Sequence, residues 1–375
     1  MRSSRRWPAA LVCLPLLAAC SVWSPPLLAP TPVDATPFDP VVQRYSASVG
    51  RLLSTSCAGA PFAGSGFVVG PGLVLTAAHV VDGARQVSVR LAGAGPVPAE
   101  VVGIDPSRDT ALVRTESDPA GTPAIALAAD ATEVGSAVVA LGYPLGESRW
   151  HREDARITSV TDSAIVNGAA MHDLLTVDAT LPIGMSGGPV LDARGVARGM
   201  VVAAIGGLGG RDSTSPVTLG IPAARLAGSL AEWRNEPPVR SVPCAGEVDR
   251  GGTGGPDLVV TSSDPDAPEL AHTLWLFGRS INAGQYPGAS GLLTPSLLTG
   301  EGGAATWAAG LGQTRWLGID VTEAGMDGDR ASARARLRTT SGEGCRVQQV
   351  DYRFVRAAGI WRVDAIEPVG EVQAC

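Results

Sequence analysis

The stretch Gly184-Met185-Ser186-Gly187-Gly188-Pro189 is a turn of small residues that presents one hydroxyl among backbone amides. A serine hydroxyl is a poor nucleophile at neutral pH, so it also needs a base and a group that orients the base. The chain supplies a candidate for each role, His79 in Thr76-Ala77-Ala78-His79 and Asp109 in Asp109-Thr110-Ala111-Leu112-Val113. Ser186, His79 and Asp109 are therefore the predicted catalytic residues.

The order of these residues along the chain, His79, Asp109, Ser186, is that of the chymotrypsin group and differs from that of subtilisin and the α/β-hydrolases. Residues 41–235 resemble a trypsin-like serine protease of the bacterial HtrA (DegP-like) type. The resemblance is carried by Gly64-Ser65-Gly66-Phe67, Thr76-Ala77-Ala78-His79-Val80-Val81, Asp105 to Val113, Asp178 to Leu191 and Gly220-Ile221-Pro222. It implies a double β-barrel with the catalytic residues in the cleft.

The chemistry and the resemblance assign the same roles. His79 takes the proton from Ser186 and later returns it to the leaving amine, while Asp109 holds the imidazole tautomer and stabilises the cation. The backbone N–H groups of Gly184 and Ser186 are expected to form the oxyanion hole, because glycine at 184 lets the peptide turn its N–H inward.

The resemblance also places the substrate-binding residues. Thr180, Leu181 and Ile183 are expected to line the primary specificity pocket, and the strand edge that binds the substrate backbone is expected at Val202, Ala203 and Ala204. No acidic residue lies in these segments to receive Lys or Arg. A small or medium apolar P1 side chain is therefore predicted.

Two features depart from the family. Position 185 is Met, where digestive relatives have an aspartate that pairs with a new N-terminal amine and HtrA relatives usually have asparagine. Activation by an N-terminal salt bridge is therefore not expected, and the oxyanion loop is either ready-made or set by an activating partner. HtrA proteins carry PDZ domains after the protease, and nothing beyond residue 235 resembles one.

The composition of the chain limits the classes of molecule that it is expected to bind. The chain has 375 residues, of which 45% are hydrophobic and 17% charged, enough for two or three compact domains. Its net charge is −7, and every basic residue is an arginine. An acidic chain without a basic block gives no footprint for nucleic acid. No metal or organic cofactor is implied, protein or peptide substrates are the expected partners, and the oligomeric state is not predicted.

The N-terminal segment has the form of an export signal. Residues 1–20 begin with arginines, continue with an apolar stretch and end in Leu17-Ala18-Ala19-Cys20, which resembles the lipobox of bacterial lipoproteins. Lipidation of Cys20 would anchor the chain to the outer side of the cell membrane, whereas an ordinary signal peptide would leave Cys20 incidental. Residues 21–40 contain six prolines and are predicted to form an extended tether.

Export permits disulfides, and four cysteines remain once Cys13 and Cys20 are set aside. Four cysteines allow three pairings. The organisation of the chain favours Cys57 with Cys244, at the two ends of one domain, and Cys345 with Cys375 within another. Free buried thiols are the alternative.

Short apolar runs separated by turn residues predict two sets of about six strands, and hence two small barrels within a trypsin-like serine protease domain at 41–235. Helical spacing at 223–233 predicts a closing helix, and 236–263 are predicted to be a linker.

The last segment, 264–375, is predicted to be an α+β accessory domain, with helices at 269–282 and 286–293 followed by four strands. It has a similarity to NTF2-like (SnoaL-like) folds. The similarity is carried by His272, Leu276-Phe277, Ile281 to Tyr286, Trp307, Cys345 and Gly359-Ile360-Trp361. Such a domain can hold a ligand, dock a partner or simply have a packed aromatic core. His151, His172 and His272 are expected to lie at the surface or in loops.

The sequence thus predicts an exported serine endopeptidase that cleaves extracytoplasmic proteins through an acyl-enzyme. Two alternatives stay open. One is a pseudoprotease that keeps the fold and binds a partner, for which Met185 leaves room. The other is a serine hydrolase that acts on esters.

Overall fold

The computed structural model describes residues 36–375 except 59, 118–121, 167–168, 206–216, 240–243 and 245–254. The predicted signal segment, Cys20 and most of the predicted tether lie outside the described residues. All described residues belong to one compact unit. Within this part of the chain, no helix is both long and apolar enough to cross a membrane.

The predicted tether was placed too far along the chain, because residues 36–40 are helical. A 3₁₀ turn η1 (Thr36–Phe38), helix α1 (Asp39–Tyr45) and a second turn η2 (Ser46–Ser48) lead into the first strand. Pro40 lies in the first turn of α1, where its missing N–H costs no hydrogen bond. Phe38, Val41 and Val42 are buried in the main core, which ties this segment to the barrels.

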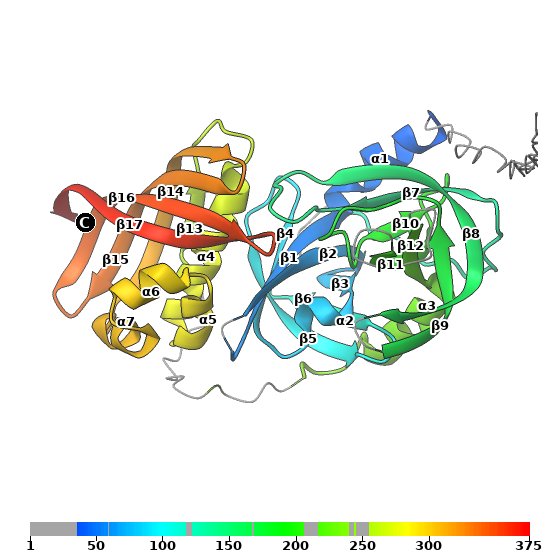
Figure 1. Cartoon of the computed structure of the whole chain (residues 1–375), viewed down its shortest axis with the longest axis horizontal. Coiled ribbons are helices and arrows are strands. Elements are labelled where there is room, and N and C mark those ends of the chain that lie inside the picture. The colour runs from blue at the N-terminus through cyan, green and yellow to red at the C-terminus, as the bar shows by residue number, and fades with distance from the viewer. Residues whose placement is uncertain are drawn as a thin grey trace, which may run out of the picture. The chain divides into compact units, whose positions relative to one another are not determined.

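Two closed six-stranded barrels follow (Figure 1). The strands of the first are β1 (Val49–Ser56), β2 (Pro61–Gly70), β3 (Leu73–Thr76), β4 (Ala84–Leu91), β5 (Val97–Asp105) and β6 (Thr110–Thr115). Those of the second are β7 (Ala137–Gly142), β8 (His151–Val166), β9 (Ala169–Val177), β10 (Pro189–Leu191), β11 (Ala197–Ile205) and β12 (Val217–Pro222). The neighbour order β1-β2-β3-β6-β5-β4 recurs as β7-β8-β9-β12-β11-β10, so the second barrel repeats the first.

Two helices belong to the barrels. The short α2 (Ala78–Val81) follows β3, and α3 (Ala223–Trp233) follows β12 with the bounds that the helical spacing predicted. Leu226 of α3 is buried in the main core, and Leu230 and Trp233 pack against it.

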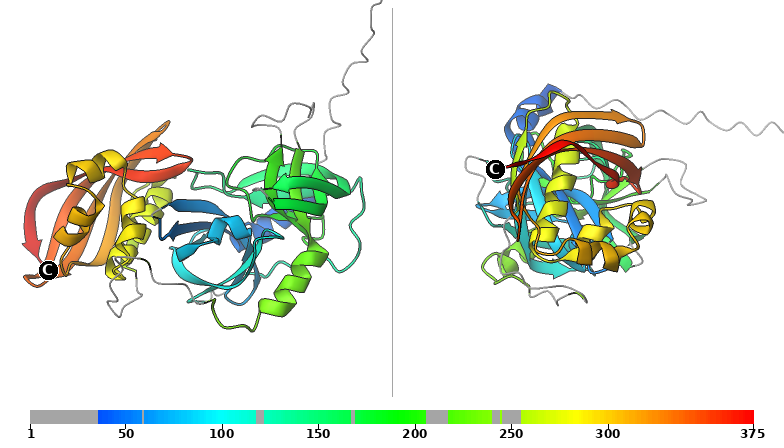
Figure 2. Two further views of the ribbon diagram at one scale, coloured as in Figure 1. Left: turned by 60° about the horizontal axis from the view of Figure 1, so that its bottom comes forward. Right: turned by 90° about the vertical axis from the view of Figure 1, so that its left-hand side faces the viewer.

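The C-terminal segment is a five-stranded sheet with helices (Figures 1 and 2). Its strands, in their order across the sheet, are β13 (Asp257–Val260), β14 (Arg315–Asp327), β15 (Arg330–Ser341), β16 (Gly344–Ala357) and β17 (Ile360–Ala374). Its helices are α4 (Ala267–Asn282), α5 (Tyr286–Gly291), α6 (Pro295–Gly300) and α7 (Ala304–Gly310). Strand β13 pairs with β14 in parallel, and the other pairs are antiparallel.

Three findings differ from the expectations for this segment. Strand β13 lies within the predicted linker 236–263, and α6 and α7 were not expected. His272 is buried, with 1% of its surface exposed, and not in a loop or at the surface. It lies on α4, and its Nε2 is 2.8 Å from Ser88 Oγ of β4. Helix α4 is buried on almost all sides because it contacts its own sheet and also the first barrel.

Two disulfides are formed. They join Cys57 to Cys244 and Cys345 to Cys375, which is the pairing that the organisation of the chain favoured. The first connects the start of the β1–β2 turn to the segment after α3. The second joins the start of β16 to the end of β17.

Candidate active site

His79 lies at the start of α2, directly after the buried strand β3. Thr76 ends that strand and donates its hydroxyl to the Ser65 carbonyl at 2.7 Å, which fixes the strand against β2. Ala77 and Ala78 are fully buried. The His79 side chain is about one-third exposed, with a relative surface of 32%. The local sequence thus anchors the backbone of α2 while its histidine reaches the surface of the cleft.

Asp109 ends a tight turn after β5. The Asp105 carboxylate accepts hydrogen bonds from the amides of Ser107 and Arg108 at 2.9 and 3.1 Å, and this shapes the turn. Asp109 itself has φ +47°, a conformation that few residues other than glycine adopt and that is often found at functional sites. Its side chain is buried and points to His79.

The His79–Asp109 pair is tightly bound. The Asp109 carboxylate accepts the His79 backbone N–H at 2.9 Å, and His79 Nδ1 lies 3.0 and 2.8 Å from its two oxygens. An ionised carboxylate can only accept, so Nδ1 carries the proton and Nε2 is left as the acceptor. This is the tautomer that a general base requires.

Ser186 lies on the turn between β9 and β10. Gly184 has φ +102°, and a Cβ there would lie 2.5 Å from the Leu145 amide nitrogen, so only glycine fits. The Ser65 amide donates to the Ser186 carbonyl at 2.8 Å, and the Ser65 hydroxyl donates to the Gly184 carbonyl at 2.8 Å. The same hydroxyl accepts the Tyr143 N–H at 2.8 Å. Strand β2 of the first barrel therefore holds the turn of the second.

Met185 is completely buried in the core of the second barrel. Its neighbours in that cluster include Val138, Leu181 and Val190. The turn is therefore anchored at this position by apolar packing, where a charged residue would need a buried partner.

The Ser186 hydroxyl faces the second barrel. Its acceptor is the Val202 carbonyl at 3.2 Å, and no hydrogen bond joins His79 to Ser186, both of which are described residues. In unliganded sites such bonds are often long or unformed. Proton transfer requires the hydroxyl to turn from Val202 to Nε2.

The predicted specificity residues whose side chains are described fall into two groups. Ile183 is 69% exposed, and Thr180 is exposed as well. Leu181 and Val202 are 3% and 2% exposed, so their side chains belong to the barrel cores and only their backbones are available. Ala203 and Ala204 lie in β11, and their side chains lie outside the described part of the chain.

Two groups of residues near the site were missed by sequence reasoning. Ser65 lies in the motif Gly64-Ser65-Gly66-Phe67, but no role at the site was predicted for it. The loop after β7 was also missed, although its Leu145 amide donates to the Ile183 carbonyl at 2.8 Å. The turn-forming residues Pro144 and Gly146 were its only visible signal.

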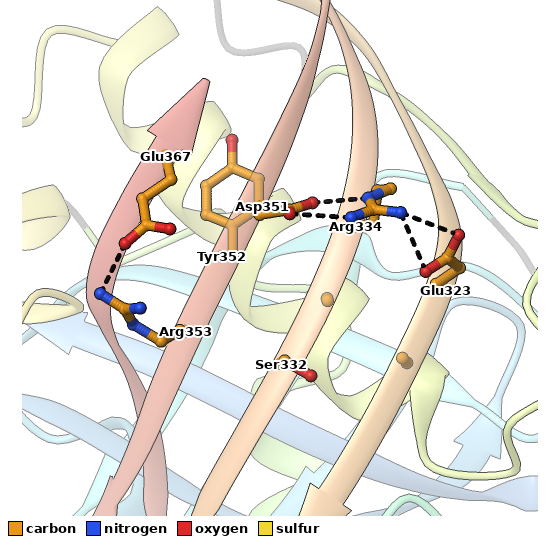
Figure 3. Close-up of a pocket in the computed structure, with 9 residues that line it drawn as sticks. Glu323, Ser332, Arg334, Asp351, Tyr352, Arg353 and Glu367 are labelled. Atoms are coloured by element: carbon orange, nitrogen blue, oxygen red, sulfur yellow. Dashed lines mark hydrogen bonds and ion pairs between the residues drawn. The ribbon is translucent and has the colours of Figure 1, made fainter. Parts of the chain in front are cut away.

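A hollow of about 310 Å³ lies far along the chain from these residues, on the C-terminal sheet (Figure 3). Arg334 contacts the carboxylates of Asp351 and Glu323, and Arg353 pairs with Glu367. The hydrogen bond between Arg334 and Asp351 raises the pKa of the guanidinium and lowers the pKa of the carboxyl group. These charges bind each other across neighbouring strands, as on many exposed sheet faces.

The two barrels are similar in sequence to known proteins. Residues 64–200 match the family model for the trypsin-like peptidase domain. The serine protease Rv3671c of Mycobacterium tuberculosis (strain ATCC 25618 / H37Rv) is 32% identical over 229 residues, which are 58% of this chain and 54% of that protein. A probable periplasmic serine endoprotease DegP-like of Halomonas elongata is 28% identical over 348 residues, covering 82% and 70%.

The crystal structure of the active form of the Rv3671c protease is 31% identical, with a TM-score of 0.49, and covers 60% of this chain and 99% of that one. The chain spans about half the length of the curated mycobacterial relative, at 54%. The matched residues 64–200 begin in β2 of the first closed barrel and end in β11 of the second. Over this range the chain is similar to a trypsin-like peptidase domain.

Proposed function

We propose that the protein is a serine endopeptidase in which Ser186 is the nucleophile, His79 the general base and Asp109 the residue that orients His79. The double contact of the Asp109 carboxylate with His79 carries the proposal, because it leaves Nε2 as a free acceptor. The related serine proteases support the same activity.

In this mechanism, substrate binding turns the Ser186 hydroxyl from the Val202 carbonyl to His79. Oγ attacks the peptide carbonyl carbon while its proton moves to Nε2, and the Asp109 carboxylate stabilises the imidazolium. The carbonyl oxygen becomes an oxyanion that accepts from the N–H groups of Gly184 and Ser186. His79 then protonates the leaving amine, and water hydrolyses the acyl-enzyme by the reverse sequence.

The position of the Ile183–Gly184 peptide supports this oxyanion hole. The Ile183 carbonyl is bound by the Leu145 amide at 2.8 Å. In a trans peptide the C=O and N–H point in opposite directions. The Gly184 N–H therefore points away from Leu145 and is not used by that loop.

The substrates are proposed to be proteins outside the cytoplasm. Two disulfides support an oxidising compartment. The predicted signal and the lipid anchor at Cys20 would place the enzyme on the outer side of the membrane. The exposed Ile183 supports an apolar P1 preference.

The C-terminal segment is proposed to be an NTF2-like module that docks against the barrels. A sheet around a long buried helix supports this fold. Its core is filled by aromatic rings: Phe277 stacks on Trp307 and meets Trp316 edge-on, with centroids 5.9 and 5.4 Å apart. Filled space of this kind favours docking over a ligand cavity.

The test compares the mature protein with Ser186→Ala in casein hydrolysis, ester hydrolysis and labelling by a fluorophosphonate probe. Labelling with casein cleavage, both lost in Ser186→Ala, is the expected result. Labelling and ester cleavage without proteolysis would favour the ester hydrolase. Neither reaction in the folded protein would favour a pseudoprotease.

A further inference from the structure

Residues 143–148, which we call the bridging loop, lie between the Ser186 turn and the C-terminal segment. The loop follows β7 and leads to β8. It contacts the turn on one side and, on the other, the residues just before α4 and the strands β16 and β17. The two sets of contacts have different consequences and are considered in turn.

The contacts to the turn hold the oxyanion hole. Leu145 donates its amide to the Ile183 carbonyl, and Tyr143 donates its amide to Ser65 Oγ, which in turn binds the Gly184 carbonyl. The Tyr143 carbonyl and the Leu145 amide approach Gly184 so closely that no Cβ fits there. A shift of the bridging loop therefore moves the peptide that carries the Gly184 N–H.

The contacts to the C-terminal segment fix the other side of the loop. Trp361 of β17 is buried and donates its indole N–H to the Gly146 carbonyl at 3.2 Å. The Ser148 hydroxyl lies 2.7 Å from both the Pro265 carbonyl and the Asp266 carboxylate and donates to one of them. A Cβ at Gly359 would lie 2.4 Å from Leu145 Cδ1, so the β16–β17 turn packs directly on Leu145.

Buried charges link the loop to α4. Arg51 of β1 donates from Nη1 to the Pro144 carbonyl at 3.1 Å, and its Nη2 is 2.5 Å from Glu269 of α4. Arg90 binds the other Glu269 oxygen at 3.3 Å and lies over the Tyr143 ring, 5.7 Å from its centroid. Arg51 and Glu269 are 1% and 3% exposed.

Burying such a cluster costs desolvation free energy, so it adds little stability over apolar packing. Its directional hydrogen bonds instead fix the relative positions of the groups that they join. One of those bonds ends on the bridging loop.

We propose that Trp361 and Arg51, with Ser148 in support, are positioning residues through which the C-terminal domain holds the bridging loop and thereby keeps the Gly184 N–H aligned in the oxyanion hole. The inference rests on the proposed endopeptidase activity and adds a role for the C-terminal domain in it. These residues touch neither the substrate nor the reacting atoms. Their effect passes through Leu145 and the Ile183 carbonyl.

An oxyanion hole acts on the transition state, so a misaligned N–H lowers kcat and leaves KM nearly unchanged. Complete loss of one donor typically costs about 10²- to 10³-fold in kcat. Loosening the loop without removing the donor is expected to cost about tenfold, because the N–H stays in the site but is no longer held in one orientation.

The test uses two variants of the full chain. Trp361→Phe with Ser148→Ala removes two hydrogen bonds to the bridging loop and keeps the ring packing. Arg51→Lys keeps a positive charge for Glu269, but its single nitrogen cannot also reach the Pro144 carbonyl. Each is expected to lower kcat for a peptide substrate about tenfold, with KM changed less than about twofold.

Ser88→Ala is the matched control. It removes the Ser88–His272 hydrogen bond from the same interface but does not touch the bridging loop. Its kcat is expected to stay within about twofold of wild type. Thermal unfolding of all variants establishes that the compared proteins are folded.

Unchanged kcat in both loop variants beside an active wild type would overturn the inference and leave the proposed activity standing. An equal fall in Ser88→Ala would also overturn it, since a general loosening of the interface would then suffice. A wild type without hydrolysis or phosphonate labelling would overturn the proposed function, and the inference with it.

Discussion

The first barrel meets the rest of the molecule at two surfaces of opposite character. Toward the second barrel, the backbone amide and the hydroxyl of Ser65 hold the catalytic turn. Toward helix α4, the contacts include the buried charges of Arg51, Arg90 and Glu269. The bonds that hold the catalytic turn are uncharged hydrogen bonds of 2.8 Å that involve backbone groups and one serine hydroxyl. The surface that the first barrel presents to α4, called the α4 surface below, depends on three charged groups. Removing Glu269 leaves both arginines without their partner.

The buried charges also perturb each other. Burial lowers the pKa of Arg51, Glu269 opposes this shift, and Arg90 adds to it. Burial, followed by Arg90 and Arg51, lowers the pKa of His272 well below its ordinary value. The contacts with α4 should therefore be sensitive to the loss of a charge and to pH. The catalytic cleft should instead be sensitive to changes in the geometry of its hydrogen bonds. The following variants test that difference.

The largest effect is expected for Asp109→Asn in the cleft. The amide would present N–H to His79 Nδ1 and force the proton onto Nε2, which removes the base. In a serine protease of known mechanism the same change lowers kcat about 10⁴-fold, and a similar loss with nearly unchanged KM is expected here. Asp105→Asn, which alters only the preceding turn, is the control. Comparable kcat values in the two variants would contradict the role of Asp109.

The next effect concerns the α4 surface. Glu269→Gln leaves Arg51 and Arg90 buried without their counter-charge, so the free energy of unfolding should fall by about 3 kcal/mol or more. Urea unfolding measures it. Glu323→Gln makes the same chemical change in the exposed ion pair with Arg334 and should have little effect. Equal losses in both variants would show that burial does not set the strength of the α4 surface.

A smaller effect is expected for Ser65→Ala. The variant leaves the Gly184 carbonyl and the Tyr143 amide without their partner, so the Ser186 turn loosens. We expect kcat to fall about tenfold or more and KM to change little. Ser48→Ala removes the hydrogen bond of another buried serine, in the turn η2 before β1, to the Pro123 carbonyl and is the control. A fall in stability alone, with kcat retained, would make Ser65 purely structural.

The smallest effect is a pH dependence from His272. Its Nε2 faces Ser88, and Arg51 and Arg90 oppose its charge, with Glu269 one turn earlier on α4. Because its pKa is lowered by folding, only the unfolded chain takes up a proton as the pH falls below about 6.5. This group alone should cost about 1.4 kcal/mol of stability per pH unit below that value.

Urea unfolding at pH 7 and pH 5 checks this prediction. His272→Gln should show a flatter pH dependence than wild type, whereas the exposed His172→Gln should not. Identical slopes in wild type and His272→Gln would mean that His272 is not kept neutral by its surroundings.

The two surfaces also differ in how far the sequence predicts them. The cleft could be anticipated because Thr76-Ala77-Ala78-His79 and the Gly184–Pro189 turn are short motifs whose order along the chain is informative. The strand runs likewise predicted two barrels, which are confirmed, and residues 64–200 match the model of the trypsin-like peptidase domain.

The α4 surface could not be anticipated, because its partners are far apart. His272 meets Ser88 across 184 positions, and Trp361 meets Gly146 across 215. The spacing of neighbouring residues gives no information about such distant pairs, so His272 was wrongly expected at the surface. The tether was misplaced for the same reason, since the burial of Phe38 depends on distant core residues. The NTF2-like fold of the C-terminal segment stays a prediction.

The central claim is that Ser186 is the nucleophile activated by His79. Peptide mapping by mass spectrometry after reaction with diisopropyl fluorophosphate tests it most directly. The account predicts one phosphoryl adduct, located on Ser186 and lost in His79→Ala. No adduct on an intact, folded protein, or an adduct on another residue, would contradict it.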